Sequence, residues 1–440
     1  MRYFGYFLSC LILSITAVSA QEKWDLQKIV DYARANNITV KQSAVQADIS
    51  QLTYNQSKLR QYPNASFNIN APYNNGRTQD PITYNLVTQS YISSGVQLQT
   101  SVDIFNWANK KNTILANQWQ LEADRANTDK LKNDIALTAA NSYLQILLSK
   151  EQENIALVQL RQTQAQLANT RKLVNAGSLP ELNAAELEAQ EARDSATYIS
   201  ARGNVAQAIL VLKSNMNLDA AAPFDVFIPP VEMIPVENIA DLQPDYVYGL
   251  AVAHLPQQRV NTFRIKAAQK FAEAARSNMY PVFTAFANLN SAYNSIYDKN
   301  SLFQQYNQNF RQSVGVAATI PIFNGSQLRT NWERSKLNIK TVEMQQEADN
   351  QQIKQDIYQA YNAATVALEK FNSSRKSVEA SQRTLEFAQK RYNVGMLGTF
   401  ELITNQNNLF RAKLEYVVNQ YDFVFKMKVL EFYKGQGLKF

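Results

Sequence analysis

The sequence contains very little cysteine and histidine, and this shortage excludes several classes of protein. Its single cysteine is Cys10 and its single histidine is His254, in a chain of 440 residues. Disulfides and thiolate metal sites are therefore not available. The motifs H-E-x-x-H, G-x-x-x-x-G-K-[ST] and G-x-S-x-G are also missing. His254 precedes Leu255-Pro256, where we interpret it as a structural residue at a helical bend. We therefore expect no catalytic site, no cofactor and no metal.

Glycine and proline are also scarce, at 12 residues each, which favours long regular elements over a loop-rich fold. The hydrophobic fraction of 45% excludes wholesale disorder. After the first twenty residues, no apolar stretch reaches the length of a membrane-spanning helix. The best run, Ile135 to Leu148, is too short and contains Asn141 and Ser142. We therefore expect no helical membrane anchor.

The beginning of the chain predicts a secretory signal peptide over residues 1–20. Arg2 precedes an apolar run, and the small residues Val18 and Ala20 stand where a signal peptidase reads the chain. A lipoprotein signal ending at Cys10 is an alternative, but it leaves only a short apolar run before the cysteine. Without Cys10 the mature chain has no thiol, so packing or oligomerisation must hold it together.

A long helix with a seven-residue repeat dominates the second half of the chain. Neither Gly nor Pro occurs between Ser326 and Val394, so roughly 70 residues could form one helix of about 100 Å. A step of seven indicates coiled-coil packing. Taken alone, this run would also suit a cytoskeletal or tethering coiled coil. The apolar positions of the repeat are Ile357, Ala364, Phe371, Val378, Leu385 and Tyr392.

The first half begins with a helix over residues 24–60, which ends before Pro63. Two alternating segments predict strands, and a turn-rich segment from 74 to 90 separates them. A helical hairpin then follows, with its turn at Gly177. The predicted first repeat covers residues 21–216, with strands at 64–74 and 91–105 and the hairpin at 109–216.

The second half repeats this order at a constant spacing. Four landmark pairs, namely Pro63 and Pro281, Phe105 and Phe323, Tyr143 and Tyr361, and Gly177 and Gly395, are each 218 positions apart. We interpret this register as an internal duplication. The predicted parts are a proline-rich connector at 217–244, a second repeat at 245–434 with strands at 282–293 and 310–323 and a hairpin at 325–434, and a tail at 435–440.

Each half supplies two strands with one apolar and one polar face, and four strands cannot close a barrel. Several copies would have to share one barrel if the apolar faces are to contact lipid. A soluble sandwich that buries these faces is the alternative. Uncharged polar residues typical of a water-filled lumen are Ser93, Gln97, Gln99, Asn288, Asn290, Ser313, Gly315 and Thr319. Aromatic residues typical of a membrane girdle are Tyr73, Tyr84, Tyr91, Tyr293, Tyr297, Phe303, Tyr306 and Phe310.

The tip of the second hairpin resembles a motif of the TolC-like outer-membrane efflux proteins. It consists of Arg391-Tyr392-Asn393-Val394-Gly395 followed by Glu401-Leu402, and the duplicated plan extends the resemblance over the mature chain. The resemblance implies a mostly α-helical homotrimer with a twelve-stranded outer-membrane β-barrel, continued by a long periplasmic α-helical barrel. Such a channel is the exit duct of a tripartite efflux or type I secretion system. Its implied partners are a periplasmic membrane-fusion adaptor, an inner-membrane pump and outer-membrane lipid.

The resemblance also implies roles for residues at the tips. Tyr392 and Glu401 match positions where family members close the periplasmic mouth and place an acidic residue. Thr404 stands where a second acid can follow, and Leu397 stands where a basic residue can. Tyr392 also fits its heptad seam as core, and Glu401 also suits a helix N-terminus. The adaptor is expected to contact the two tips at Gly177, Ser178, Leu179, Gly395, Met396 and Leu397.

The charge pattern and the strands bear on the remaining alternatives. The net charge is +7, but the basic residues are interspersed with acidic ones, which indicates solvated faces and no nucleic-acid partner. A soluble periplasmic coiled-coil adaptor or tethering protein would share the helical hairpins. It would have no use for four amphipathic strands with aromatic ends. We therefore expect the outer membrane of a Gram-negative cell as the location, with a long periplasmic part.

Overall fold

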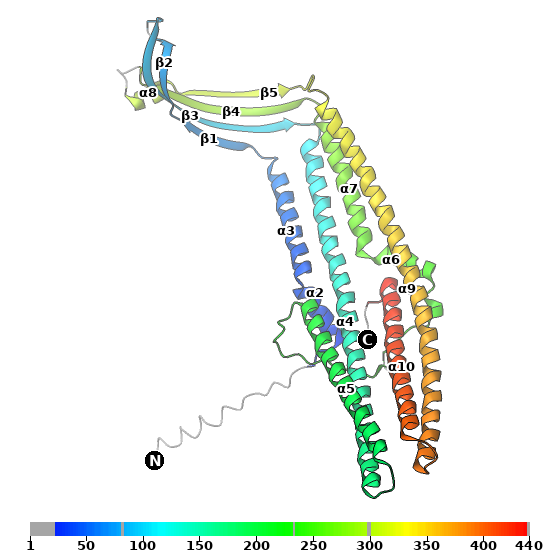
Figure 1. Cartoon of the computed structure of the whole chain (residues 1–440). Coiled ribbons are helices and arrows are strands. Elements are labelled where there is room, and N and C mark those ends of the chain that lie inside the picture. Colours follow the sequence, from blue (N-terminus) through cyan, green and yellow to red (C-terminus); the bar gives the residue numbers. More distant parts are fainter. Residues whose placement is uncertain (1–22, 81–82, 232–233, 297–300, 438–440) are drawn as a thin grey trace, which may run out of the picture. The chain divides into compact units, whose positions relative to one another are not determined.

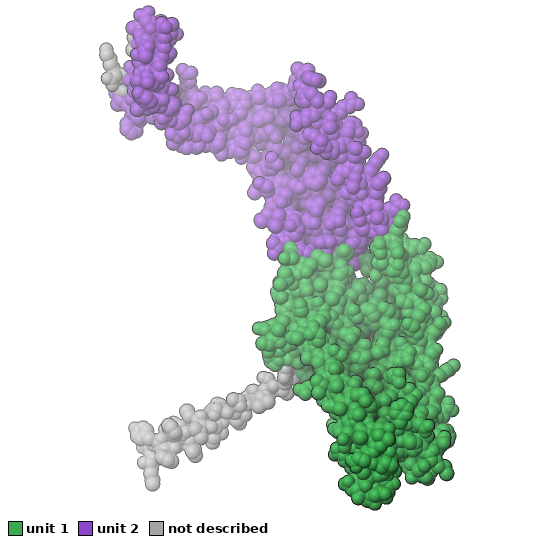
Figure 2. Space-filling view, in the orientation of Figure 1, with its two compact units in different colours: residues 1–42, 129–255, 350–440 green, residues 43–128, 256–349 purple. Residues whose placement is uncertain are grey.

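The computed structural model describes residues 23–80, 83–231, 234–296 and 301–437. Figure 1 labels the helices and strands of the chain, which forms the two compact units coloured separately in Figure 2. The predicted signal peptide, including Cys10, lies outside the described residues, and so does Tyr297 of the predicted aromatic girdle. Unit 1 comprises residues 1–42, 129–255 and 350–440, and unit 2 comprises residues 43–128 and 256–349.

Long helices make up most of the chain. In the part of the chain that the structure describes, no helix combines the length and the hydropathy needed to cross a membrane. The helices are α2 (Leu26–Asn36), α3 (Ile38–Leu59), α4 (Asn109–Asn175), α5 (Glu181–Met216), η2 (Ile239–Asp241), α6 (Pro244–His254), α7 (Pro256–Ser277), α8 (Leu302–Gln308), α9 (Gln327–Asn393) and α10 (Thr399–Lys434). The strands are β1 (Asn64–Asn70), β2 (Tyr73–Gln79), β3 (Leu86–Phe105), β4 (Val282–Asn294) and β5 (Arg311–Thr319).

The two halves contain helices of equal length. The long helices α4 and α9 have 67 residues each, and the returning helices α5 and α10 have 36 residues each. The uninterrupted helix predicted before Gly395 is thus confirmed. Two of its heptad positions, Ile357 and Ala364, are fully buried, whereas the later position Phe371 is only half-buried.

The first helix of each half is broken, and the two breaks are in register. Asn37 separates α2 from α3, where its side-chain amide donates to the Asn215 carbonyl at 2.9 Å and its side-chain oxygen accepts from the Thr39 N–H. Leu255 separates α6 from α7, because Pro256 cannot continue the hydrogen-bond pattern of the preceding helix. The single helix expected over 24–60 is therefore wrong, while the bend after His254 is confirmed.

The predicted turn-rich segment from 74 to 90 is wrong, because it forms a hairpin. Tyr73–Gln79 pairs antiparallel with Leu86–Ile92 at the start of a 20-residue β3. Pro72 lacks a backbone N–H, so β1 ends at Asn70 instead of continuing to residue 74. Similarly, β5 ends at Thr319 instead of residue 323, because Pro321 cannot donate to a ladder.

The five strands form one antiparallel sheet in unit 2. Its order is β1-β3-β4-β5, and β2 pairs with the first residues of β3, before the stretch that pairs with β1. The pairing of β3 with β4 joins the two halves of the sequence, from Ser93 opposite Asn294 to Phe105 opposite Phe283. The outer strands β1 and β5 each have only one neighbour in the described chain.

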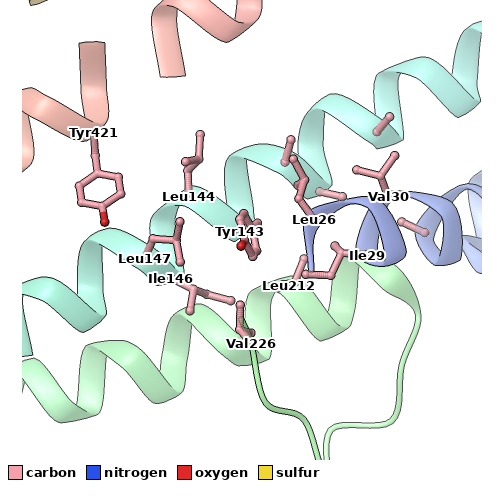
Figure 3. Close-up of a cluster of buried hydrophobic side chains, with 14 of the residues drawn as sticks. Leu26, Ile29, Val30, Tyr143, Leu144, Ile146, Leu147, Leu212, Val226 and Tyr421 are labelled. Atoms are coloured by element: carbon pink, nitrogen blue, oxygen red, sulfur yellow. The ribbon is translucent and has the colours of Figure 1, made fainter. Parts of the chain in front are cut away.

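The main apolar core lies in unit 1, where α2 packs against α4 and α5 (Figure 3). Tyr143 of α4 lies at its centre, and its hydroxyl donates to the Phe227 carbonyl at 2.8 Å. Burial raises the pKa of Tyr143 to about 12. This core fastens the connector after α5 to the helices. Residues labelled in Figure 3 are Leu26, Ile29, Val30, Tyr143, Leu144, Ile146, Leu147, Leu212, Val226 and Tyr421.

Candidate functional site: an exposed sheet face and two helical tips

The sheet of unit 2 has one apolar and one polar face, as its sequence pattern predicted. Residues directly opposite each other in an antiparallel pair point to the same face. Leu98 lies opposite both Phe67 and Leu289, whereas the adjacent Gln97 lies opposite Asn68 and Asn290. The apolar face carries Ala65, Phe67, Ile69, Val96, Leu98, Val102, Ala285, Ala287, Leu289, Val314 and Val316.

Most of the apolar face is not covered by the rest of the described chain. Val314 is 86% exposed, and Phe67, Ile69, Leu98 and Val316 are exposed as well. All five strands in the described ranges belong to one sheet, so the soluble sandwich considered above does not form within one chain. Water is an unfavourable environment for such a surface, whose burial is worth about 25 cal/mol per Å². The face is suited to contact with hydrocarbon.

The opposite face presents mainly uncharged polar groups, including Gln97, Asn288 and Ser313. It also carries Asp103, whose carboxylate lies 3.0 Å from the Lys110 ammonium. A neutral polar face of this kind is typical of the wall of a water-filled lumen.

A second aromatic cluster, which the sequence analysis missed, lies where the sheet meets the helices. The ring of Trp107 lies 5.1 Å from that of Phe105 and 5.0 Å from that of Tyr280, and its indole N–H donates to the Pro281 carbonyl. Phe283 lies beside Phe105. The predicted girdle at the loop ends of the strands thus has a counterpart at their helix ends. Two aromatic bands around an apolar band are typical of membrane barrels.

The two helical hairpins end in tips of the same backbone geometry. Gly177 and Gly395 adopt φ values of +73° and +77°, a region that favours glycine. At the first tip, the N–H of Ser178 donates to the Leu173 carbonyl, and the N–H of Gly177 donates to the Val174 carbonyl. The equivalent bonds form at the second tip, so both α4 and α9 end in a Schellman motif. The two glycines that are 218 positions apart in the sequence therefore occupy the same place in two copies of one turn.

Tyr392 lies between the two hairpins of unit 1. Its hydroxyl is 3.4 Å from the Thr170 hydroxyl of α4 and 3.5 Å from the Thr399 hydroxyl of α10. Both threonines are almost fully buried, while Tyr392 is half-buried. The side chain thus connects both hairpins within one chain, and its role in closing a mouth stays a prediction.

Glu401 lies in the first turn of α10 with its side chain exposed. Gly398 is the N-cap of this helix and has no side chain to satisfy the first N–H groups. A carboxylate here is stabilised by the helix dipole. Thr404 is exposed one turn later, and its hydroxyl donates to the Phe400 carbonyl at 2.8 Å. Of the predicted adaptor contacts, Met396 is exposed, whereas Leu179 and Leu397 are half-buried.

A buried polar cluster near the tips was also missed by the sequence analysis. The Thr163 hydroxyl donates to one oxygen of the Asp194 carboxylate at 2.6 Å, and the Gln190 amide donates to the other at 2.7 Å. Gln190 and Asn407 also exchange hydrogen bonds, at 3.1 and 3.3 Å. The cluster joins α4, α5 and α10 and fixes their alignment. Asp194 gives no sequence signal, because charged residues surround it along the helix.

The model of the family described as outer membrane efflux protein matches residues 29–217 and 247–429 of the chain. The chain is similar to the outer membrane protein TolC of Escherichia coli, with 19% identity over 94% of this chain and 82% of that protein. It is also similar to the proteases secretion protein PrtF of Dickeya chrysanthemi, with 22% identity over 93% and 87%.

Solved structures show the same fold. The outer membrane protein VceC of Vibrio cholerae superposes with a TM-score of 0.76 at 14% identity, over 94% of this chain and 97% of that chain. The two family matches lie one in each half of the sequence, and each includes a hairpin tip and ends close to the end of the returning helix, α5 or α10. The predicted resemblance is thus confirmed, and the chain belongs to the outer membrane efflux protein family.

Proposed function

We propose that three copies of this chain form the exit duct of an efflux or type I secretion system. Each copy contributes β1, β3, β4 and β5 to a twelve-stranded barrel in the outer membrane, and the helices form a tunnel through the periplasm. The observation that carries this proposal is the exposed apolar face of the sheet, together with the open edges of β1 and β5.

The number of strands supports the assembly. An unpaired backbone group in hydrocarbon is unfavourable by several kcal/mol, so only a closed sheet can span a membrane. Two copies would supply eight strands, and a barrel of that size is filled by its own side chains. Twelve strands leave room for a lumen, and the polar face with Gln97, Asn288 and Ser313 suits its wall.

The domain organisation belongs to the same proposal. The signal peptide is removed after residue 20, and residues 21–216 and 245–434 are duplicated halves joined by the connector 217–244. Equal helix lengths and the register of the breaks at Asn37 and Leu255 support the duplication.

At the periplasmic end, a membrane-fusion adaptor docks on the two tips and connects the duct to an inner-membrane pump. The exposed apolar side chains of Val394, Met396 and Phe400 support a protein contact at the second tip. Glu401 and Thr404 line the mouth, and Tyr392 holds the two hairpins of each copy together beside it.

Membrane fractionation and native mass measurement test the assembly. The protein extracted from the outer membrane in detergent should have the mass of three chains. A monodisperse soluble monomer in the periplasmic fraction would contradict the proposal.

Docking at the tip is tested best at Met396. Gly395 is a poor site for substitution, because its φ of +77° would strain any other residue. Met396 is 70% exposed, so Met396→Glu should block export while the trimer stays intact. The matched control is Met344→Glu in α9, which lies in unit 2 away from the tip and has a side chain that is 68% exposed. If Met396→Glu exports as well as Met344→Glu does, the docking surface lies elsewhere.

A further inference from the structure

The short helix α8, in the connection between β4 and β5, lies at the end of the sheet near β2 (Figure 1). The Tyr306 and Ser94 hydroxyls are 2.6 Å apart, and the Ser291 hydroxyl donates to the Tyr306 carbonyl at 2.6 Å. Ser291 lies opposite Val96 in the β3–β4 pair, and Ser94 lies two residues before Val96. Both serines therefore share the face of Val96, so α8 covers a small polar area on an otherwise apolar surface.

Polar side chains fasten α8 to the sheet. Gln305 is 3% exposed, its side-chain oxygen accepts from the Asn294 N–H at 3.0 Å, and its amide donates to the Asn294 carbonyl at 3.1 Å. The Asn309 amide donates to the Ala292 carbonyl at 2.7 Å. A capping box between Ser301 and Gln304 stabilises the start of the helix.

The apolar residues of the same segment are exposed. Phe303 is 84% exposed, and Leu302 and Phe310 are exposed as well. A helix on the surface of a soluble protein has the opposite arrangement, with its apolar side inward. Residues 302–310 carry no charged side chain, and the exposed amides of Gln304, Asn307 and Gln308 suit the headgroup side of the membrane boundary better than hydrocarbon.

We propose that α8 is an anchor in the outer leaflet of the membrane, with Leu302, Phe303 and Phe310 inserted at the boundary between acyl chains and headgroups. The anchor rests on the proposed function in one respect, namely that the apolar sheet face contacts lipid. The exposed side of α8 continues that face. Because α7 leads into the start of β4, the far end of β4 and α8 lie at the end of the strands opposite the helices. Aromatic side chains are favoured at such a boundary.

Single-cysteine labelling of the full-length protein tests the anchor. Residues 21–440 contain no cysteine, so an environment-sensitive fluorophore is attached specifically at Phe303→Cys, Val314→Cys or Gln99→Cys. The trimer is reconstituted into phosphatidylcholine vesicles, and quenching by spin-labelled lipid is compared with quenching by iodide in water. Val314 reports the apolar face, and Gln99 reports the polar face.

We expect spin-labelled lipid to quench the labels at Phe303 and Val314, and iodide to quench the label at Gln99. If Val314 is quenched by lipid but Phe303 only by iodide, the anchor is refuted while the lipid-facing sheet stands. If neither quencher reaches Phe303, protein covers it, and α8 is a contact between copies instead. If lipid does not quench Val314, the lipid-facing sheet fails, and the anchor fails with it.

A second variant asks whether the fastening of α8 positions the anchor. Gln305→Ala removes both hydrogen bonds to Asn294, and we expect the label at Phe303 to lose its quenching by lipid. Asn307→Ala alters an exposed residue of the same helix and should leave that quenching unchanged. The Val314 label in each background shows whether the sheet has inserted. Unchanged lipid quenching at Phe303 in Gln305→Ala would contradict the anchoring contact.

Discussion

Adjacent residues of β5 provide a direct test of which face of the sheet meets lipid. Val314 and Ser313 lie on the two different faces of the sheet. Val314 pairs with Ala287 of β4, and Ser313 pairs with Asn288. Arginine at either position adds the same side chain to the same strand. Val314→Arg places the charge on the apolar face, whereas Ser313→Arg places it on the polar face.

The two variants should differ by several kcal/mol in the stability of the membrane-inserted state. Arginine on the lipid face of a barrel is unfavourable by about 2–4 kcal/mol near the bilayer midplane and by about 0–1 kcal/mol near its surfaces. Val314 is close to the middle of the nine-residue β5, so the larger value applies. Three copies would raise the total to roughly 6–12 kcal/mol per trimer. Ser313→Arg faces water in the lumen and avoids this term.

Outer-membrane fractionation and heating of the trimer in detergent measure the difference. Val314→Arg should reduce insertion and lower the temperature at which the trimer dissociates, whereas Ser313→Arg should insert normally. In planar bilayers, the added charge of Ser313→Arg should shift selectivity toward anions. Normal insertion of Val314→Arg, or an equal loss in both variants, would refute the assignment of the two faces.

Three further variants test unit 1. Burial raises the pKa of Tyr143 from 10.0 to about 12, because the folded chain favours the neutral phenol. About 2–3 kcal/mol of stability that is present below about pH 10 should therefore be lost as the pH rises to about 12. Denaturant unfolding of Tyr143→Phe should show a smaller alkaline loss. Asp194→Leu leaves the buried donors of Thr163 and Gln190 unpaired and should lower stability by roughly 2–6 kcal/mol, measured by heating, with Asp194→Asn less affected. Glu401→Gln should reduce cation preference in planar bilayers if the residue lines the mouth; a loss of thermal stability alone would make it a helix cap.

The two long hairpins and the two-faced sheet could be predicted from the sequence, because each is indicated by a strong pattern that repeats along the chain. The steps of seven before Tyr392 and the landmark spacing between Gly177 and Gly395 predicted two long hairpins, and the helices end within a few residues of the expected positions. The alternation around Leu98 predicted two different faces of the sheet. Each of these signals is carried by many residues, so no single local contact can override it.

Elements that depend on polar contacts could not be predicted in this way. The β2 hairpin has no apolar alternation, because its residues are largely exposed. The helix α8 is held by Gln305 and Tyr306, and neither residue type marks a buried position in a sequence. The buried position of Asp194 depends on Thr163, which is 31 residues away along the hairpin. Such contacts exist only once the helices are aligned.

Each of the two units has surfaces that lack a packing partner within the described chain. In unit 2, the apolar sheet face is exposed and the edges of β1 and β5 are open. In unit 1, the heptad positions Ile357 and Ala364 of α9 are fully buried, but Phe371 and Val378 further along the seam remain half-buried. A coiled-coil seam that packs fully in one stretch and only partly in the next lacks partner surface, since its repeat continues unchanged. Copies of the chain that close the sheet would also supply helices beside α9, so one assembly satisfies the strands and the seam together.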